Sequence, residues 1–216
     1  MKWPFFITLL SGLTILNCGA DEAKSSAKPP CCREALPLGA YTDQSLYQLD
    51  SKWTSDVSRE LKLGVLRGRP QVLVMFFAQC EYACPRLVHN LKALESAMKV
   101  DLRQKVDFLL ISFDSDRDTP EALRAYREKN KLGMANWTLL RGAGDDVREL
   151  AALLGINYVK DARGQFAHSN VVTVLNADGE IAYQHQGLED GSLKIIEILE
   201  RLTADAARPS GRKTSQ

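Results

Sequence analysis

Two cysteines, Cys80 and Cys84, stand four residues apart between an apolar run at 72–77 and a stretch whose apolar residues recur at helical spacing. The run is typical of a central β-strand covered on both faces, and the stretch predicts a helix that begins near Cys84. The dipole at a helix N-terminus stabilises a thiolate, and residues four apart share one helix face. The two sulfurs can therefore join as a redox-active disulfide or bind one soft metal ion such as Cu(I).

Two sulfurs rarely complete a metal site, and the chain has three histidines that can supply a third ligand. His89 falls on the cysteine helix, on a face expected to meet solvent, and His185 falls in a C-terminal hairpin strand. His168 directly precedes an apolar strand, in a loop that a thioredoxin-like fold brings beside the cysteines. Spacing alone leaves His168 either as a ligand or as a surface histidine without a task. Two thiolates and an imidazole suit copper.

The remaining pattern alternates strands and helices. Asp118 or Thr119 can cap a helix whose first residue is Pro120, and Asp178-Gly179 predicts a tight hairpin turn. The expected elements are an N-terminal hairpin within 46–66, strands at 72–77, 106–113, 137–140 and 171–175, a last strand at 180–184, and helices at 84–100, from 120, at 145–154 and at 193–202. This order predicts an α/β, thioredoxin-like fold: a mostly parallel central sheet flanked by helices, with a C-terminal β-hairpin.

Three stretches resemble one known family. The sequence CEYACP at 80–85 resembles the CxxxCP motif of the SCO/SenC copper chaperones. The sequence FDSDRDTPE at 113–121 is similar to the family's DPxRDTPE segment, and His168-Ser169, followed by a strand and Asp178-Gly179, is similar to its histidine loop and hairpin. The resemblance covers about residues 70 to 202.

The resemblance implies one bound copper ion, Cu(I) and/or Cu(II), held by Cys80, Cys84 and His168. It implies that Asp114 and Asp118 lie next to the ligands without binding the metal and adjust the properties of the site. Asp118 can equally serve as a helix cap. Members of the family assist assembly of the dinuclear copper site of cytochrome c oxidase. The expected partners are therefore the copper-bearing oxidase subunit or another cuproprotein, together with a thiol reductant.

The chain departs from the family pattern beside the histidine. Ala167 stands where an aspartate often precedes it, and Ser115 replaces a usual proline. Ala78-Gln79 stands where the family often has a threonine before the first cysteine. These changes leave the three ligands intact, and the change at Ala167 is expected to alter copper affinity or redox poise.

Other functions use the same cysteines. A thiol-disulfide oxidoreductase can act on a partner's cysteines without carrying copper, although CxxC spacing is more usual there. A peroxidase is disfavoured, because Phe77 stands where a hydroxyl residue would polarise the peroxide. A purely structural disulfide is disfavoured because closing a four-residue loop stabilises little. A metallochaperone is favoured over an enzyme.

The N-terminal residues indicate export. Residues 1–17 have the length and apolarity of a signal peptide, and residues 15–18 resemble a bacterial lipobox with Cys18 as the lipidated residue. An uncleaved anchor and a simple secreted form are the alternatives. We expect a lipid-anchored flexible tether at 18–33, a thioredoxin-like copper-binding domain at 34–205 and a disordered tail at 206–216. This places the domain on the extracytoplasmic side of a bacterial cell envelope.

Two further observations bear on partners. The formal net charge of +1 does not favour a nucleic-acid partner, which would require a basic patch. The adjacent Cys31 and Cys32 can bind metal, form a vicinal disulfide or have no essential role.

Overall fold

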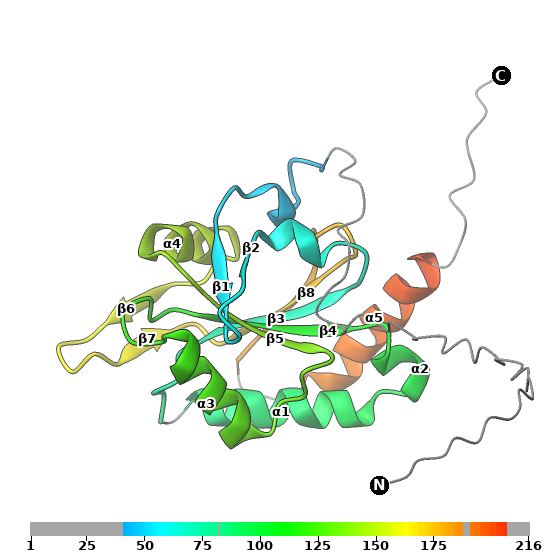
Figure 1. Cartoon of the computed structure of the whole chain (residues 1–216). Helices are drawn as coiled ribbons and strands as arrows, with labels where there is room; N and C mark the ends of the chain where they lie inside the picture. The colour runs from blue at the N-terminus through cyan, green and yellow to red at the C-terminus, as the bar shows by residue number, and fades with distance from the viewer. Residues whose placement is uncertain (1–40, 82, 188–190, 207–216) are drawn as a thin grey trace, which may run out of the picture.

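The structure is a computed structural model that describes residues 41–81, 83–187 and 191–206 (Figure 1). The predicted signal peptide and tether, with Cys18, Cys31 and Cys32, lie outside the described residues, as do 34–40 and 207–216. Within the described part of the chain, none of the helices has the length and apolarity needed to cross a membrane.

A seven-stranded sheet forms the centre of the fold, with strand order β2-β1-β5-β4-β3-β8-β9. Its strands are β1 (Trp53–Ser55), β2 (Glu60–Leu61), β3 (Gln71–Phe76), β4 (Asp107–Ser112), β5 (Trp137–Gly142), β8 (Val171–Leu175) and β9 (Ile181–Gln186). The three central strands β3, β4 and β5 run parallel, while β1, β2, β8 and β9 pair antiparallel to their neighbours. The sheet is thus mixed around a parallel centre, and the predicted α/β, thioredoxin-like fold class is confirmed.

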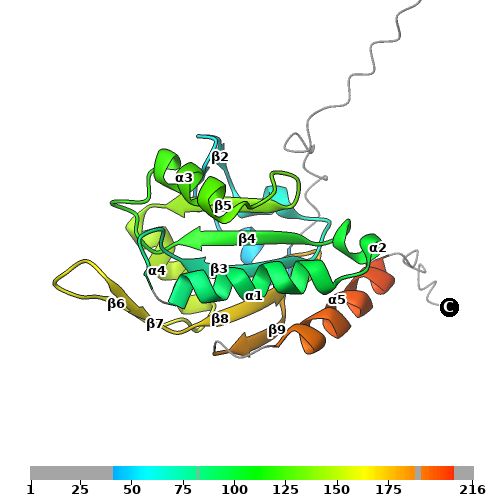
Figure 2. The ribbon, with the colours of Figure 1, turned by 90° about the horizontal axis from the view of Figure 1, so that it is seen from below.

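The helices cover both faces of this sheet. They are α1 (Ala83–Ala97), α2 (Val100–Arg103), α3 (Pro120–Asn130), α4 (Gly144–Leu153) and α5 (Ser192–Ala206), with 3-10 turns η1 (Leu46–Gln48) and η2 (Leu63–Leu66). Figures 1 and 2 show α1, α3 and α5 on one face and α4 on the other. Right-handed crossovers that step from β3 to β4 to β5 in one direction must place α1 and α3 on the same face. Every residue of β3 is buried as a result.

The start of α3 separates two roles that the sequence left open. The Thr119 side chain accepts a hydrogen bond from the Ala122 N–H at 3.3 Å, and Pro120 occupies the first turn. Thr119 is therefore the helix cap. The cap alternative for Asp118 is wrong, because its side chain is fully buried and bonds elsewhere.

A second, small hairpin carries His168. Strands β6 (Tyr158–Lys160) and β7 (Phe166–His168) pair antiparallel, apart from the main sheet, and the sequence had indicated only a loop here. Its turn is ordered by Asp161, whose side chain accepts from the Gln165 N–H at 2.9 Å. Figure 2 shows this hairpin projecting beyond the end of the main sheet. Three-residue strands with little apolar alternation give no strand signal in a sequence, which explains the omission.

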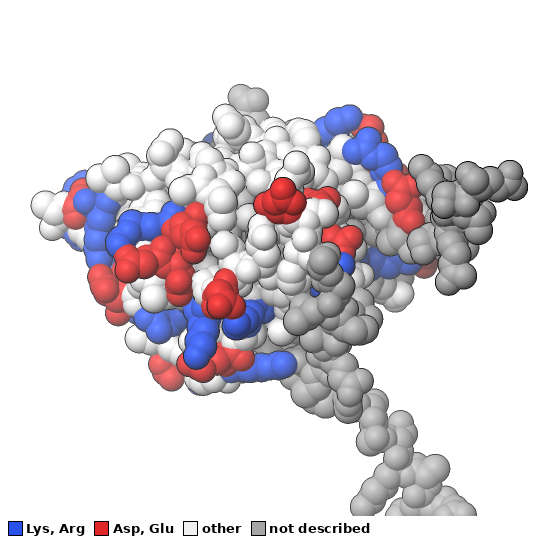
Figure 3. Space-filling model, turned by 90° about the horizontal axis from the view of Figure 1, so that it is seen from above, with Lys and Arg blue, Asp and Glu red and all other residues white. Residues whose placement is uncertain are grey.

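The face seen in Figure 3 carries both signs of charge side by side, with a broad area that is neither acidic nor basic. Among the exposed ion pairs of the protein, one joins Arg148 to Asp145 within α4. Charges on this face therefore compensate one another locally.

A buried ion pair joins the N-terminal hairpin to α3. The Arg127 guanidinium binds both carboxylate oxygens of Asp56, at 2.5 and 3.1 Å, and donates to the Trp137 carbonyl at 2.9 Å. Both side chains are less than a tenth exposed. Trp53, the first residue of β1, is fully buried. The pair fixes β1 against the parallel centre.

Replacing Asp56 with alanine should lower the free energy of unfolding by about 3–5 kcal/mol, because it leaves the Arg127 charge buried without its partner. Urea unfolding of the purified protein measures the change. Asp145→Ala, which breaks the exposed pair with Arg148, is the control and should have little effect. Equal effects of the two substitutions would contradict the prediction.

Candidate metal centre

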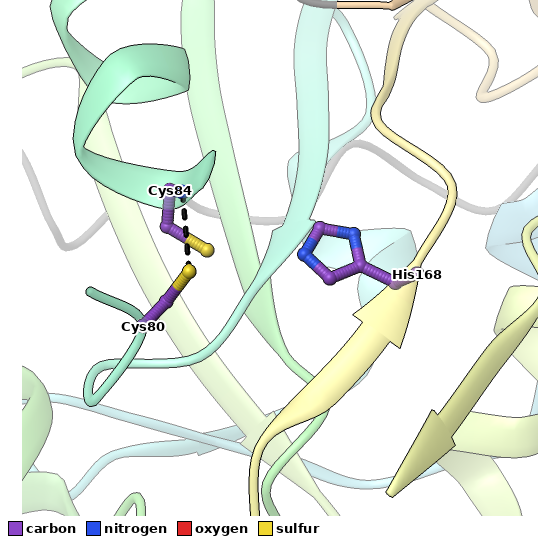
Figure 4. A group of neighbouring side chains, drawn as sticks. All are labelled: Cys80, Cys84 and His168. Carbon is purple, nitrogen blue, oxygen red and sulfur yellow. Dashed lines mark hydrogen bonds between the residues drawn. The ribbon is translucent and has the colours of Figure 1, made fainter. Parts of the chain in front are cut away.

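The two cysteines lie at the C-terminal end of the central strand β3. Cys80 is in the turn after β3, and Cys84 is the second residue of α1. The Cys84 N–H donates to the Cys80 sulfur at 3.2 Å, as Figure 4 shows. Both residues are thiols rather than a disulfide. Cys84 is fully buried and Cys80 is partly exposed, so the two sulfurs differ in their access to solvent and to partners.

His168 is the last residue of β7, and its ring faces the two sulfurs in Figure 4. The ring Nδ1 lies 3.1 Å from the Ser169 carbonyl oxygen. Because a carbonyl oxygen only accepts, Nδ1 carries the proton and Nε2 keeps a lone pair. A backbone carbonyl that orients one ring nitrogen in this way is the usual support of a metal-binding histidine.

The three side chains come together as a group able to hold one metal ion. Ligand atoms of Cys80, Cys84 and His168 all lie within 4.8 Å of one another. Bonds of about 2.0–2.3 Å to a common tetrahedral or trigonal ion place ligand atoms within about 4 Å of each other, so a small inward shift of the side chains suffices to bind an ion. Among residues 41–81, 83–187 and 191–206, this is the one such group of at least three histidine, cysteine or acidic residues. His89, which is exposed on α1, and His185, on β9, are not part of it.

An aromatic cluster holds the histidine in place. The His168 ring centroid lies 5.0 Å from that of Phe113, which follows β4, and 6.3 Å from that of Phe77, which follows β3. The cluster continues through Phe166, 5.1 Å from Phe77, and Tyr158, 4.8 Å from Phe113. Rings from the main sheet thus pack against rings from the β6–β7 hairpin and orient His168 toward the cysteines.

Asp118 lies beneath the cysteine turn. Its Oδ2 accepts from the Ala78 N–H at 2.9 Å and from the Ser112 hydroxyl. Its Oδ1 is buried and makes no hydrogen bond within the described residues. Burial is the largest influence on this carboxyl group and raises its pKa, against the lowering effect of the two donors. Asp118 therefore positions the segment just before Cys80 from inside the protein.

Asp114 faces the histidine hairpin instead. Its buried carboxylate is paired with the Arg117 guanidinium, and Lys160 of β6 lies 3.7 Å from Oδ1. Arg117 in turn donates to the Gly164 carbonyl in the turn of that hairpin. The two aspartates predicted to support the site therefore contact different halves of it.

The chemistry of Cys84 departs from the sequence argument. The hydrogen bond with Cys80 and burial raise the pKa of the Cys84 thiol, and the Asp118 charge raises it further. A backbone hydrogen bond from Phe77 lowers it only partly. The expectation that the helix N-terminus would stabilise a thiolate here is thus outweighed, because burial in an apolar setting penalises the charge. The Cys84 thiol is therefore protonated at neutral pH, and a metal ion that binds its sulfur must displace this proton.

Sequence reasoning missed Tyr126 of α3. Its hydroxyl is buried and has no hydrogen-bond partner among the described residues. Burial raises the pKa of Tyr126, and negative charge on Cys84 and Cys80 raises it further. The available signal was its helical spacing from the buried Leu123, which puts both residues on the inner face of α3.

Ala167, the departure from the family pattern, is exposed, while His168 next to it is half-buried. Neighbouring side chains on a strand point to opposite faces, so position 167 on β7 is directed away from the cysteines. The structure gives no sign that a side chain at this position would contact the three candidate ligands.

Comparison with known proteins agrees with this geometry. The model of the SCO1/SenC family matches residues 44–204. The chain belongs to the SCO1/SenC family. A protein of Stutzerimonas stutzeri described as "Putative copper-binding protein" is 26% identical over 120 residues, 54% of this chain and 57% of that protein. The chain thus matches little more than half the length of that relative.

Solved structures share the fold. A SCO1/SenC family lipoprotein from Bacillus anthracis is 24% identical, with a TM-score of 0.66 over 76% of this chain and 99% of that chain. Yeast Sco1 with copper bound is 17% identical, with a TM-score of 0.58 over 77% of this chain and 97% of that one. At these identities the likeness establishes the thioredoxin-like fold of this SCO1/SenC protein.

Asp118→Asn should keep the fold, because an amide oxygen can accept the same bonds from Ala78 and Ser112. Because burial raises the pKa of Asp118 in the folded protein, this carboxyl group ionises at lower pH in the unfolded chain than in the folded one. The folded state therefore loses stability as the pH rises from the ordinary aspartate pKa through the raised pKa. Wild type should therefore lose stability relative to the variant over that interval. Urea unfolding at a series of pH values measures the difference, and a pH-independent difference would rule the explanation out.

Proposed function

We propose that this protein binds one copper ion through Cys80, Cys84 and His168 and transfers it to a partner protein. The observation that carries the proposal is the convergence of two sulfurs and one imidazole within 4.8 Å from segments far apart in the sequence. Thiolate ligands select Cu(I) over hard cations such as Mg²⁺ and Ca²⁺. The copper bound to yeast Sco1 and the description of the Stutzerimonas relative support the choice of metal.

Binding exchanges protons for the metal. Cu(I) replaces the proton of each cysteine thiol, and the His168 Nε2 lone pair completes the ligand set. Cys84 is buried and its position is fixed by α1, whereas Cys80 is reachable from solvent. A partner ligand can therefore approach the copper on the Cys80 side and displace the ligands one at a time. This arrangement favours transfer over permanent storage.

The proposed recipient is the copper-bearing subunit of cytochrome c oxidase, or another cuproprotein. BsSco, another solved structure of this fold, is described as a member of the Sco family of cytochrome c oxidase assembly proteins. The signal-like residues 1–17 and the lipobox-like Cys18 support a location at the membrane, outside the cytoplasm, which is part of this proposal. The Bacillus anthracis lipoprotein of the same family supports that location.

A thiol-disulfide oxidoreductase is the second candidate, and the unequal exposure of the two cysteines favours it. The exposed Cys80, as thiolate, can attack a partner's disulfide and form a mixed disulfide. Cys84 then loses its proton, bonds to the Cys80 sulfur and releases the partner's thiol. The partner gains two electrons and the site becomes a disulfide, which a thiol reductant must reduce again.

An anaerobic Cu(I) titration of the detergent-solubilised full-length protein tests the ligand set. Wild type should bind one tight equivalent, and Cys80→Ala, Cys84→Ala and His168→Ala should each weaken or abolish binding, because each removes one ligand. His89→Ala is the matched control, since His89 is exposed on α1 and outside the group. The measurement is copper retained after desalting and competition with a Cu(I) chelator.

The outcomes separate the two candidates. Copper binding that survives His168→Ala unchanged would refute the proposed ligand set. An absence of copper binding in wild type, together with reversible formation of a Cys80–Cys84 disulfide, would establish the oxidoreductase instead.

Copper affinity should rise with pH. The raised pKa of Cys84 keeps this thiol protonated through the neutral range, so every copper ion bound must release at least the Cys84 proton. The Cu(I) association constant should therefore increase by at least roughly tenfold per pH unit between about pH 6 and about pH 8. A chelator competition corrected for the chelator's own protonation measures the slope. A pH-independent affinity would show that Cys84 is not a ligand.

A further inference from the structure

One short segment touches both halves of the site. Residues 114–118 follow β4, and Asp118 at one end holds the Ala78 N–H beneath the cysteine turn. Arg117, one residue earlier, reaches the β6–β7 hairpin, which carries His168. We propose that Arg117 is a positioning residue that holds His168 within reach of the cysteines, an inference that rests on the copper site proposed above.

The contacts of Arg117 are directed and partly buried. Its Nε binds Asp114 Oδ2, and its Nη2 donates to the Gly164 carbonyl, 47 residues away in the sequence. The Asp114 side chain is fully buried and the Arg117 side chain is 29% exposed. A buried carboxylate requires a charged partner, so Asp114 fixes the guanidinium, and the guanidinium fixes the turn.

The turn fits closely against this guanidinium. A Cβ atom added at Gly164 would lie only 2.8 Å from Arg117 Nη1, and the Gly164 φ of +76° favours glycine in any case. Lys160 of β6 adds a weaker electrostatic tie, 3.7 Å from Asp114 and 3.1 Å from Asp116. The segment 114–118 thus contacts the hairpin at two points: at Lys160, the end of β6, and at Gly164, in the turn before β7.

The hairpin depends on such contacts because its own pairing is short. Its two three-residue strands form a separate two-stranded sheet, and an isolated pair of this size is marginally stable in water. Aromatic packing with Phe77 and Phe113 orients the base of the hairpin, near His168. Arg117 holds the turn at the other end, four residues before His168. Without it, the hairpin and its histidine gain freedom to move relative to the cysteines.

The test uses Arg117→Gln in the full-length protein, with two readouts. Hydrogen exchange of the β6–β7 amides in the metal-free protein should become faster, while exchange in β3 stays unchanged. Cu(I) affinity should fall by roughly tenfold or more, the usual effect of losing a residue that supports a metal ligand. In the double variant with His168→Ala, affinity should equal that of His168→Ala alone, because Arg117 acts through the histidine.

Two further variants sharpen the result. Arg117→Lys keeps the charge but lacks the planar fork, and should restore part of the affinity. Arg163→Gln is the matched control: Arg163 is exposed on the same hairpin and binds only Asp161 of its own turn among the contacts found, so exchange and affinity should not change.

Three results would overturn the inference. They are unchanged hairpin exchange in Arg117→Gln, unchanged copper affinity in that variant while His168→Ala loses copper, and losses that add in the double variant. If wild type binds no copper, the proposed function fails. The exchange experiment on the metal-free protein still decides whether Arg117 positions the hairpin. A global loss of structure in Arg117→Gln leaves the decision to Arg117→Lys.

Discussion

The parallel pairing of β3 with β4 is the constraint on which the site depends. Because parallel strands end at the same edge of a sheet, the cysteine turn after β3 lies beside the acidic segment after β4. The Phe113 N–H donates to the Phe76 carbonyl at 2.7 Å and continues the pairing beyond the strands. Asp118 then reaches across to the Ala78 N–H. The cysteine turn is thereby fixed by the backbone of one strand and a buried carboxylate from the next.

Burial decides the electrostatics of this edge. A helix N-terminus favours a thiolate, yet the pKa of Cys84 is raised, because its sulfur lies in the interior with Cys80 and the Asp118 carboxylate close by. The same burial raises the pKa of Asp118 itself. Such a site disfavours negative charge on its thiols until a cation enters. A bound metal ion would supply the positive charge that compensates the thiolates. The difference in exposure between the buried Cys84 and the partly exposed Cys80 is compatible with both proposed functions, copper exchange and disulfide exchange.

The histidine is held by a different kind of support. The cysteines belong to the turn after β3 and to the first helix, whereas His168 belongs to a small hairpin that forms a separate two-stranded sheet. Aromatic rings and the Asp114–Arg117 pair make that connection. The three proposed ligands are thus divided between the end of the main sheet, which carries the two sulfurs, and a separate hairpin, which carries the imidazole.

The sequence by itself determined the fold class and singled out Cys80 and Cys84, because continuous apolar runs, a CxxxC spacing and an Asp-Gly turn are local signals that survive without tertiary context. His168 became the predicted third ligand only through the resemblance to the SCO/SenC family. Only the tertiary structure decided how Asp114 and Asp118 divide their contacts, that Thr119 rather than Asp118 caps α3, and that His168 sits on a strand. It also brought Arg117 and Tyr126 to the site. These features depend on burial and on contacts between residues far apart in the sequence, such as Arg117 and Gly164, which are 47 positions apart, and no local pattern encodes such contacts.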